Sequence, residues 1–464
     1  MTPAVVEALG AIVGAGGIAR GEAIDERYRT DILKKSRSDP GVVVRPASTE
    51  QVAAVVKLAS ANGIPVTPLG GGTGLVGGGI ASPGGILLSL ERMNRIVEID
   101  EVSMTVTAES GAVLETVQGA TEAKGLLLPL DLGARGSATI GGTISTNAGG
   151  TRVLRWGMMR DMVLGLEAVL ADGTIVSTMG KSLKDNAGYD WKQLMIGSEG
   201  TLGIVTRAVL RLRPNPRSAQ TAMVATGSVE DVGTMLRFLQ ARLAGRLSSF
   251  ELMWRNFYEF VTEGQRDKRP PPMPGGAAIY VLVEALGDDE EADAASFATA
   301  LEELFERGLV ADAVIAQSER QRAELWATRD DLIDVMAAIK PRYAYDVSMA
   351  LSDMAAFVAD TEARVEAALP GATLMFYGHG GDGNLHVVVG PGDVPGGYDR
   401  ASGAVYAATQ GVGGSVSAEH GIGTYKQAYI GLTRSPAELD LMRRLKRALD
   451  PDGILNPGKV VPPA

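Results

Sequence analysis

The sequence predicts an α+β protein of two large domains, and three features lead to that prediction. The chain has 464 residues, more than one ordinary domain core accommodates. Residues 42–67 have the hydrophobic pattern of a strand, a helix and a strand, and short strand-like runs between glycine turns follow. Longer helical patterns alternate with strands later in the chain. We expect domains over 1–215 and 216–435, and a C-terminal segment, 436–464, that returns to the first.

The first domain contains a strand-helix-strand unit near its start. A β-branched run, Val42 to Val44, precedes Ser48, a typical helix N-cap residue, with Gln51 three residues later. Valines then recur at intervals of three and four residues, which is the spacing of a core-facing helix. Asn62-Gly63 ends the helix, and a strand at Ile64 to Thr67 completes the unit.

Short strands are expected through the rest of this domain. The run VLGLEAVLADGTIVS predicts a hairpin that turns at Asp172-Gly173, and AVLETVQGATEA has a helical pattern. Further strands are expected at GILLSL, RIVEID, MTVTAES and LGIVTRAVLRLRP.

The second domain has a different pattern, and two prolines, Pro214 and Pro216, mark the boundary. Helices are expected at about 228–243, 289–307 and 318–340, with strands such as AAIYVLVEA between them. A helix followed by a tail rich in proline and glycine, AELDLMRRLKRALDPDGILNPGKVV, ends the chain.

The composition excludes several classes of function. With 44 basic and 55 acidic residues the net charge is −11, so no electrostatic footprint for nucleic acid is present. The absence of cysteine excludes disulfides, thiolate nucleophiles and iron–sulfur ligation. The N-terminal stretch resembles an amphipathic helix more than a signal peptide, and no apolar run has transmembrane length. We expect a cytoplasmic protein, with peripheral association at the inner membrane as the alternative location.

A glycine-rich loop, IPVTPLGGGTGLVGGG at 64–79, contains a literal match to the dinucleotide fingerprint G-x-G-x-x-G. In a Rossmann domain this motif opens a helix, whose amino end holds the pyrophosphate. Here more glycines and Pro83 follow without helical periodicity, so an NAD-binding Rossmann domain is disfavoured. A run of backbone amides in such a loop can still bind an anion.

Three further loops occur at 129–157, 184–206 and 452–459. Together with the first loop they resemble the FAD-binding domain of the vanillyl-alcohol oxidase superfamily, also called the p-cresol methylhydroxylase type. Over about residues 40–460 the chain is similar to the branch that holds the D subunit of glycolate oxidase, D-lactate dehydrogenase and D-2-hydroxyglutarate dehydrogenase. The resemblance implies a ferredoxin-like α+β substrate domain after the FAD domain, and a C-terminal helical segment.

The resemblance also implies which residues contact FAD. A first loop matches the pyrophosphate site, two segments line the flavin, and a fourth packs near the adenine. The three histidines all lie outside these loops, so we expect non-covalent FAD. The residues are Pro68, Gly70, Gly71, Gly72, Thr73, Gly74, Leu75, Asp131, Ser137, Thr139, Gly141, Gly142, Thr143, Asn147, Glu199, Gly203, Ile204 and Asn456.

The three histidines occur in two glycine-rich motifs, YGHGGDGNLHVVV and SAEHGIGTYK. A hairpin in the first would bring His379 and His386 together, and two imidazoles with the carboxylate of Glu419 are suitable ligands for zinc or a similar divalent ion. The resemblance implies that these three residues bind the metal and that His420 is the catalytic base.

The implied reaction is oxidation of a small D-2-hydroxy acid to the 2-oxo acid, with hydride transfer to flavin N5. Arg329 matches an arginine that contacts the substrate carboxylate, and Tyr345 and Asn384 are further candidate substrate contacts. Relatives that oxidise 2-hydroxyglutarate carry a lysine and an asparagine where this chain has Ala344 and Val388. We therefore expect a monocarboxylate substrate such as lactate, glycolate or a larger 2-hydroxy acid.

Two other interpretations remain open from sequence. One is a flavin oxidase of the same fold that uses O2, and the other is a non-catalytic FAD-binding subunit of a larger complex. A dehydrogenase needs an electron acceptor, which we expect to be a quinone, an electron-transfer flavoprotein or a cytochrome. We also expect a homodimer.

Overall fold

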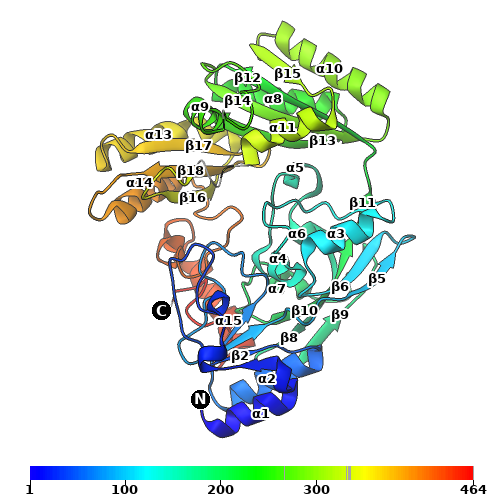
Figure 1. Ribbon diagram of the computed structural model, residues 1–464, viewed down its shortest axis with the longest axis vertical. Helices are drawn as coiled ribbons and strands as arrows, with labels where there is room; N and C mark the ends of the chain where they lie inside the picture. Colours follow the sequence, from blue (N-terminus) through cyan, green and yellow to red (C-terminus); the bar gives the residue numbers. More distant parts are fainter. Residues whose placement is uncertain (266, 331, 333–335, 463–464) are drawn as a thin grey trace. The chain divides into compact units, whose positions relative to one another are not determined.

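The computed structural model describes residues 1–265, 267–330, 332 and 336–462, and these form an α+β fold, as predicted (Figure 1). The chain divides into two compact units. Unit 1 comprises Met1–Gly149, Gly157–Asn215 and Glu419–Ala464, and unit 2 comprises Gly150–Trp156 and Pro216–Ala418. The chain thus returns to unit 1 at Glu419, earlier than the expected boundary at 436.

The first sheet of unit 1 has the order β1-β2-β4-β3. Its strands β2, β3 and β4 are parallel, and β1 adds an antiparallel edge. Helix α2 connects β2 to β3 and buries its valine stripe against the sheet together with α1. The Ser48 hydroxyl accepts a hydrogen bond from the Gln51 amide, as expected of an N-cap. The elements are α1 (Pro3–Val13), β1 (Ile18–Ala19), β2 (Val42–Val44), α2 (Thr49–Ala61), β3 (Val66–Leu69) and β4 (Ile86–Ser89).

The second sheet of unit 1 is antiparallel, with the order β5-β6-β10-β8-β9. Strands β8 and β9 form the hairpin predicted around Gly173, where a positive φ suits glycine. Helices α3, α4, α6 and α7 connect the strands, and a short pair, β7 with β11, lies apart. The elements are β5 (Ile96–Asp100), β6 (Thr105–Glu109), α3 (Leu114–Glu122), β7 (Leu126–Leu127), α4 (Ile140–Thr146), α6 (Met159–Met162), β8 (Val163–Val169), β9 (Ile175–Thr178), α7 (Lys192–Met195), β10 (Ile204–Arg211) and β11 (Arg213–Pro214).

The C-terminal tail is bound into the first sheet of unit 1. After α15 (Pro436–Leu449), the amide of Val66 in β3 donates to the carbonyl of Ile454, and the amide of Asn456 donates back to Val66, both at 2.8 Å. The tail therefore lies beside β3, the strand that leads into the glycine loop.

Unit 2 is built on one seven-stranded antiparallel sheet with the order β15-β12-β14-β13-β17-β18-β16 (Figure 1). Apolar residues of α9, α11 and the central strands form its core on one face. The strands are β12 (Ser218–Thr226), β13 (Leu247–Trp254), β14 (Ile279–Gly287), β15 (Asp312–Ile315), β16 (Tyr343–Ser348), β17 (Thr373–His379) and β18 (Asn384–Gly390). The helices are α5 (Val153–Trp156), α8 (Val229–Arg242), α9 (Arg255–Gly264), α10 (Glu290–Glu306), α11 (Glu319–Asp330), α13 (Met354–Ala368) and α14 (Gly397–Gly411).

The expected helices near 228–243 and 289–307 correspond to α8 and α10. The helix expected over 318–340 is described as α11 up to Asp330, and residues 331 and 333–335 lie outside the described part of the chain. Within the described residues no helix is long and apolar enough to cross a membrane.

Candidate active site

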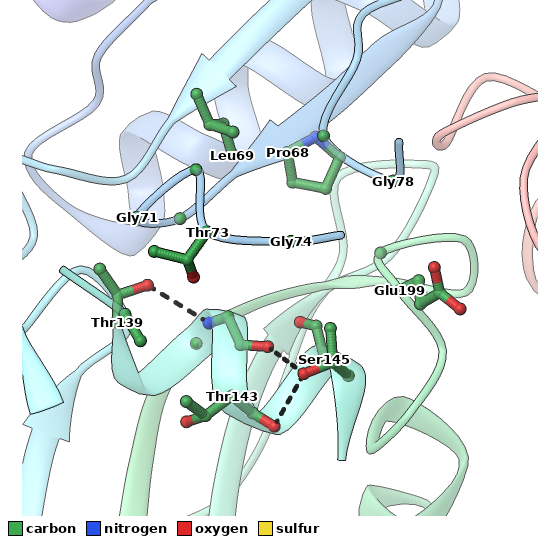
Figure 2. Close-up of a pocket in the computed structure, with 18 of the residues that line it drawn as sticks. Pro68, Leu69, Gly71, Thr73, Gly74, Gly78, Thr139, Thr143, Ser145 and Glu199 are labelled. Atoms are coloured by element: carbon green, nitrogen blue, oxygen red, sulfur yellow. Dashed lines mark hydrogen bonds between the residues drawn. The ribbon is translucent and has the colours of Figure 1, made fainter. Parts of the chain in front are cut away.

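A cavity of about 420 Å³ lies within unit 1, against the glycine loop that follows β3. Figure 2 shows this loop, from Pro68 to Gly78, passing across α4, with Glu199 beside it. Instead of opening a helix, the loop leads to the strand β4, so the Rossmann context is absent here as the sequence predicted. The volume is in the range of sites that bind small molecules and cofactors.

Close packing forces glycine at the base of this loop. A Cβ atom at Gly71 would collide with the carbonyl oxygen of Ser137, and one at Gly70 would collide with the hydroxyl of Thr139. The Thr139 hydroxyl in turn caps α4 by accepting from the Gly142 amide at 3.4 Å. The loop therefore lies directly on the segment that begins α4.

The backbone of the loop has hydrogen-bonding capacity to spare. In the described part of the chain, the amides of Gly71, Gly72, Thr73 and Gly74 donate to no backbone carbonyl. Free amides on successive residues form a concave donor surface for anionic oxygens. This backbone suits the pyrophosphate of a dinucleotide cofactor such as FAD.

Most of the residues predicted to contact FAD line this cavity. The lining includes Pro68, Gly70, Gly71, Gly72, Thr73, Gly74, Leu75, Thr139, Gly141, Gly142, Thr143, Glu199, Gly203 and Ile204. Four others are not among the lining residues: Asp131, Ser137, Asn147 and Asn456. Of these, Asn456 donates from its side chain to the carbonyls of Gly78 and Glu199, at 3.0 and 2.8 Å, and so ties the tail to both loops.

Sequence reasoning missed a second wall of the cavity, formed by Arg27, Tyr28 and Asp31. These residues belong to an irregular N-terminal segment with no glycine motif. Their position depends on long-range contacts, among them the bond from the Tyr425 hydroxyl to Asp31 at 2.6 Å. No local pattern could have identified them.

Glu199 holds the segment in which the chain returns to unit 1. Its two carboxylate oxygens accept the amides of Ile422 and Gly423, at 2.7 and 2.9 Å. Burial raises the pKa of Glu199 above its usual range, against the opposing effect of these amides and of Lys426 and Lys459. The carboxylate therefore determines where the backbone that follows His420 lies.

Glu419 and His420 begin this returning segment, and both line the cavity. Their side chains lie 3.7 Å apart, from His420 Nε2 to Glu419 Oε1. The structure thus places the predicted base and one predicted metal ligand at the cavity that the glycine loop forms.

The other two histidines lie together in unit 2. His379 ends β17, and His386 is in β18, where it pairs with Tyr377. Paired residues such as Tyr377 and His386 have their side chains on the same face of the sheet, and His379, two residues after Tyr377, points to that face as well. Both imidazoles therefore lie on one side of the sheet. Their ring centroids are 5.3 Å apart and the rings are nearly perpendicular. The predicted hairpin does bring this pair together.

Asp346 lies on the same face and was not singled out from the sequence. It pairs with His386 across β16 and β18 and is fully buried. Its carboxylate accepts from the Asn384 side chain at 2.9 Å and from the Ala418 amide at 3.1 Å. Asp346 and His386 both offer metal-donor atoms, as do Glu419 and His420 in unit 1. An acidic residue in a strand usually faces water, so the pattern alone gave no signal.

The three predicted substrate contacts have protein partners in unit 2. Arg329 forms an ion pair with Glu251, with 3.0 Å between Nη2 and Oε2. Asn384 donates to Asp346 and to the Val347 carbonyl. Tyr345 lies on the opposite face of β16 from Asp346, where its hydroxyl is 3.1 Å from that of Ser402.

The chain belongs to the family of FAD-linked oxidases: residues 40–179 match the FAD binding domain and residues 215–460 match the FAD linked oxidases, C-terminal domain. It is therefore an FAD-linked enzyme, and the resemblance inferred from its motifs is confirmed.

Curated relatives extend over most of the chain. D-2-hydroxyglutarate dehydrogenase of Xanthomonas citri is 40% identical over 441 residues, covering 94% of this chain and 92% of that protein. The mitochondrial D-2-hydroxyglutarate dehydrogenase of Bos taurus is 39% identical, and the match covers 94% of this chain and 80% of that protein. A putative mitochondrial D-lactate dehydrogenase of Schizosaccharomyces pombe is 36% identical, and the match covers 94% of this chain and 84% of that protein.

Solved structures agree on the fold. p-Cresol methylhydroxylase with substrate bound is similar with a TM-score of 0.78 at 19% identity, covering 98% of this chain and 96% of that one. 4-Ethylphenol oxidase from Gulosibacter chungangensis is similar with a TM-score of 0.73 at 20% identity. The match covers 98% of this chain and 96% of that one. The predicted p-cresol methylhydroxylase-type fold is confirmed.

Proposed function

We propose that this protein is a D-2-hydroxyacid dehydrogenase that oxidises a monocarboxylate such as D-lactate with FAD and a bound divalent cation, zinc. The observation that carries the proposal is His420, which lines the same cavity as the glycine loop. A proton acceptor is thereby next to the expected cofactor. The relatives named above support oxidation of a D-2-hydroxy acid.

His420 accepts the hydroxyl proton of the substrate in this proposal. A neutral imidazole within hydrogen-bond reach is the usual side chain for that step near neutral pH. FAD, when bound, supplies the two-electron acceptor.

The metal ligands in this proposal are His379, His386 and Glu419. Two adjacent imidazoles in unit 2 support it, and so does the chain path, because Ala418 is held by Asp346 and Glu419 follows directly. Two imidazoles and a carboxylate form a typical catalytic zinc set with one position left for substrate. When bound, the cation supplies a Lewis acid that lowers the hydroxyl pKa.

The preference for a monocarboxylate rests on Ala344 and Val388. These two residues pair across β16 and β18, two positions from the Asp346–His386 pair and on the same face. Val388 is buried in an apolar core. Neither side chain offers a charge or a hydrogen-bond donor that could compensate the desolvation of a second carboxylate.

The substrate test is anaerobic incubation of the FAD-loaded protein with D-lactate, L-lactate, glycolate or D-2-hydroxyglutarate. The 2-oxo acid formed is then quantified. FAD is the only oxidant present, so at most one equivalent of 2-oxo acid forms per flavin; we expect pyruvate from D-lactate, little product from L-lactate, and slower product formation from D-2-hydroxyglutarate. Turnover of D-2-hydroxyglutarate faster than that of D-lactate would contradict the substrate proposal, and no product from any acid would favour a non-catalytic FAD-binding subunit.

The electron acceptor is proposed to be a quinone, an electron-transfer flavoprotein or a cytochrome. Adding each acceptor, or air, to the reduced protein and following flavin reoxidation distinguishes these from an O2-using oxidase.

We also propose a homodimer, which light scattering of the purified protein tests.

A further inference from the structure

A buried carboxylate, Glu251, links two of the side chains discussed above. It lies in β13 directly opposite His379 in β17, and its side chain is 1% exposed. One oxygen lies 2.8 Å from His379 Nδ1, and the other lies 3.0 Å from Arg329 Nη2. All three side chains belong to unit 2.

The chemistry of this contact determines which nitrogen of His379 carries the proton. An ionised carboxylate only accepts hydrogen bonds, so Nδ1 must be the donor. The neutral imidazole then carries its lone pair on Nε2, the nitrogen through which it would ligate the proposed metal. Arg329 compensates the buried charge of Glu251, which would otherwise be costly.

Arg329 also supports the second imidazole through an aromatic ring. Its guanidinium lies over Tyr377, 4.8 Å from the ring centroid, and the Tyr377 ring is 4.9 Å from that of His386. Phe257 of α9 stacks on Tyr377 at 4.3 Å. One guanidinium thus contacts the neighbours of both histidines.

We propose that Glu251 and Arg329 are positioning residues for the imidazole pair: Glu251 holds His379 as the Nδ1–H tautomer, and Arg329 holds Glu251. The inference rests on the proposed function in taking the pair as metal ligands. It gives Arg329 a role different from the substrate contact expected from sequence.

The most informative variant is Glu251→Gln, because arginine can only donate hydrogen bonds. The carbonyl of the introduced amide should turn to Arg329, which leaves the amide NH2 facing His379. That NH2 donates to Nδ1, so His379 should change to the Nε2–H tautomer and lose its metal-binding lone pair.

Glu284→Gln is the matched control. Glu284 is also buried, lies in the adjacent strand β14, and accepts from Trp326 of α11 at 2.8 Å. It contacts neither histidine by any described hydrogen bond, so its loss should leave the tautomer unchanged.

The first readout is the ¹⁵N spectrum of histidine-labelled, metal-free, FAD-loaded protein at mildly alkaline pH. Only three histidines contribute, and His379→Gln assigns the signal. We expect the Nδ1–H tautomer in the wild type and in Glu284→Gln, and the Nε2–H tautomer in Glu251→Gln. An unchanged tautomer in Glu251→Gln would overturn the proposal.

The second readout is Zn²⁺ affinity, measured by competition with a chromophoric chelator. Loss of such a partner typically weakens binding by about 10- to 100-fold, and we expect that for Glu251→Gln alone. Equal affinity of Glu251→Gln and the wild type would also overturn the proposal. If the wild type bound no Zn²⁺, the proposed metal function would fail, while the ¹⁵N spectrum would still test the positioning role.

Discussion

The cavity of unit 1 is built differently from the imidazole face of unit 2, the side of the sheet that carries Asp346, His379 and His386. In unit 1 the groups that suit the cofactor's pyrophosphate are backbone amides, and glycines let the loop lie on α4. In unit 2 they are side chains on a regular antiparallel sheet, where strand register determines which residues meet. Each region depends on a buried glutamate, but Glu199 accepts hydrogen bonds from backbone amides, whereas Glu251 contacts the side chains of His379 and Arg329.

This difference predicts different sensitivities to substitution. The backbone-built region should be disrupted by adding a single carbon and should tolerate side-chain changes on its surface. The side-chain region should tolerate small changes of volume but not a change of hydrogen-bond donor or acceptor. The following predictions test that contrast, beginning with the largest expected effect.

His420→Asn should reduce the rate of flavin reduction by roughly 10²- to 10⁴-fold, the usual contribution of a general base. The measurement is stopped-flow absorbance with D-lactate under anaerobic conditions. FAD content and the oxidised flavin spectrum should be unchanged, which serves as the control. A rate within threefold of wild type would exclude His420 as the base.

Glu199→Ala should slow the same step by about 100-fold, since a small displacement of a catalytic group has a cost of that order. The variant removes both acceptors that hold Ile422 and Gly423, just beyond His420. Because binding of D-lactate by other residues should survive, kcat should fall more than KM rises. The control is Glu122→Gln, an exposed carboxyl on α3 that should have no effect.

Gly71→Ala should destabilise the protein by about 1–3 kcal/mol, because overpacking displaces the loop from Ser137. FAD retention during gel filtration should fall in parallel with the melting temperature. Gly119→Ala is the control: this helical glycine of α3 has open space around it, so alanine should stabilise by about 0.5–1 kcal/mol. Equal behaviour of the two variants would contradict the backbone-built description of unit 1.

Ala344→Lys should raise the preference for D-2-hydroxyglutarate over D-lactate by about tenfold, the value of one hydrogen bond to a charged group. The ratio of kcat/KM for the two acids is the measurement. Ala356→Lys, on helix α13, introduces the same charge elsewhere and should leave the ratio unchanged. A similar shift in both variants would mean that net charge, not position, is responsible.

Local sequence patterns predicted much of this fold and part of the site. Ser48, the valine stripe of α2 and the Asp172-Gly173 turn are short-range signals, and each forms the expected element. The glycine loops and both histidine motifs are also contiguous, so their roles could be proposed from sequence. The resemblance to a known family then connected them to FAD.

The partners of these motifs depend on long-range pairing and were not predictable. Glu251 and His379 are far apart in the chain and meet only because β13 and β17 are neighbours. Asp346 and Tyr345 are consecutive, yet one joins the imidazole face and the other packs against α14. Only the register of β16 assigns each to its face.

The proposed function requires that D-lactate reduce the flavin with the help of a metal bound at the imidazole pair. Its most direct test is the rate of anaerobic flavin bleaching by D-lactate in wild-type protein, before chelation, after EDTA treatment, and after Zn²⁺ is restored. We expect fast bleaching, at least a 100-fold loss after chelation with FAD retained, and recovery with Zn²⁺. Bleaching that is equally fast in the chelated protein would contradict the proposed role of the metal.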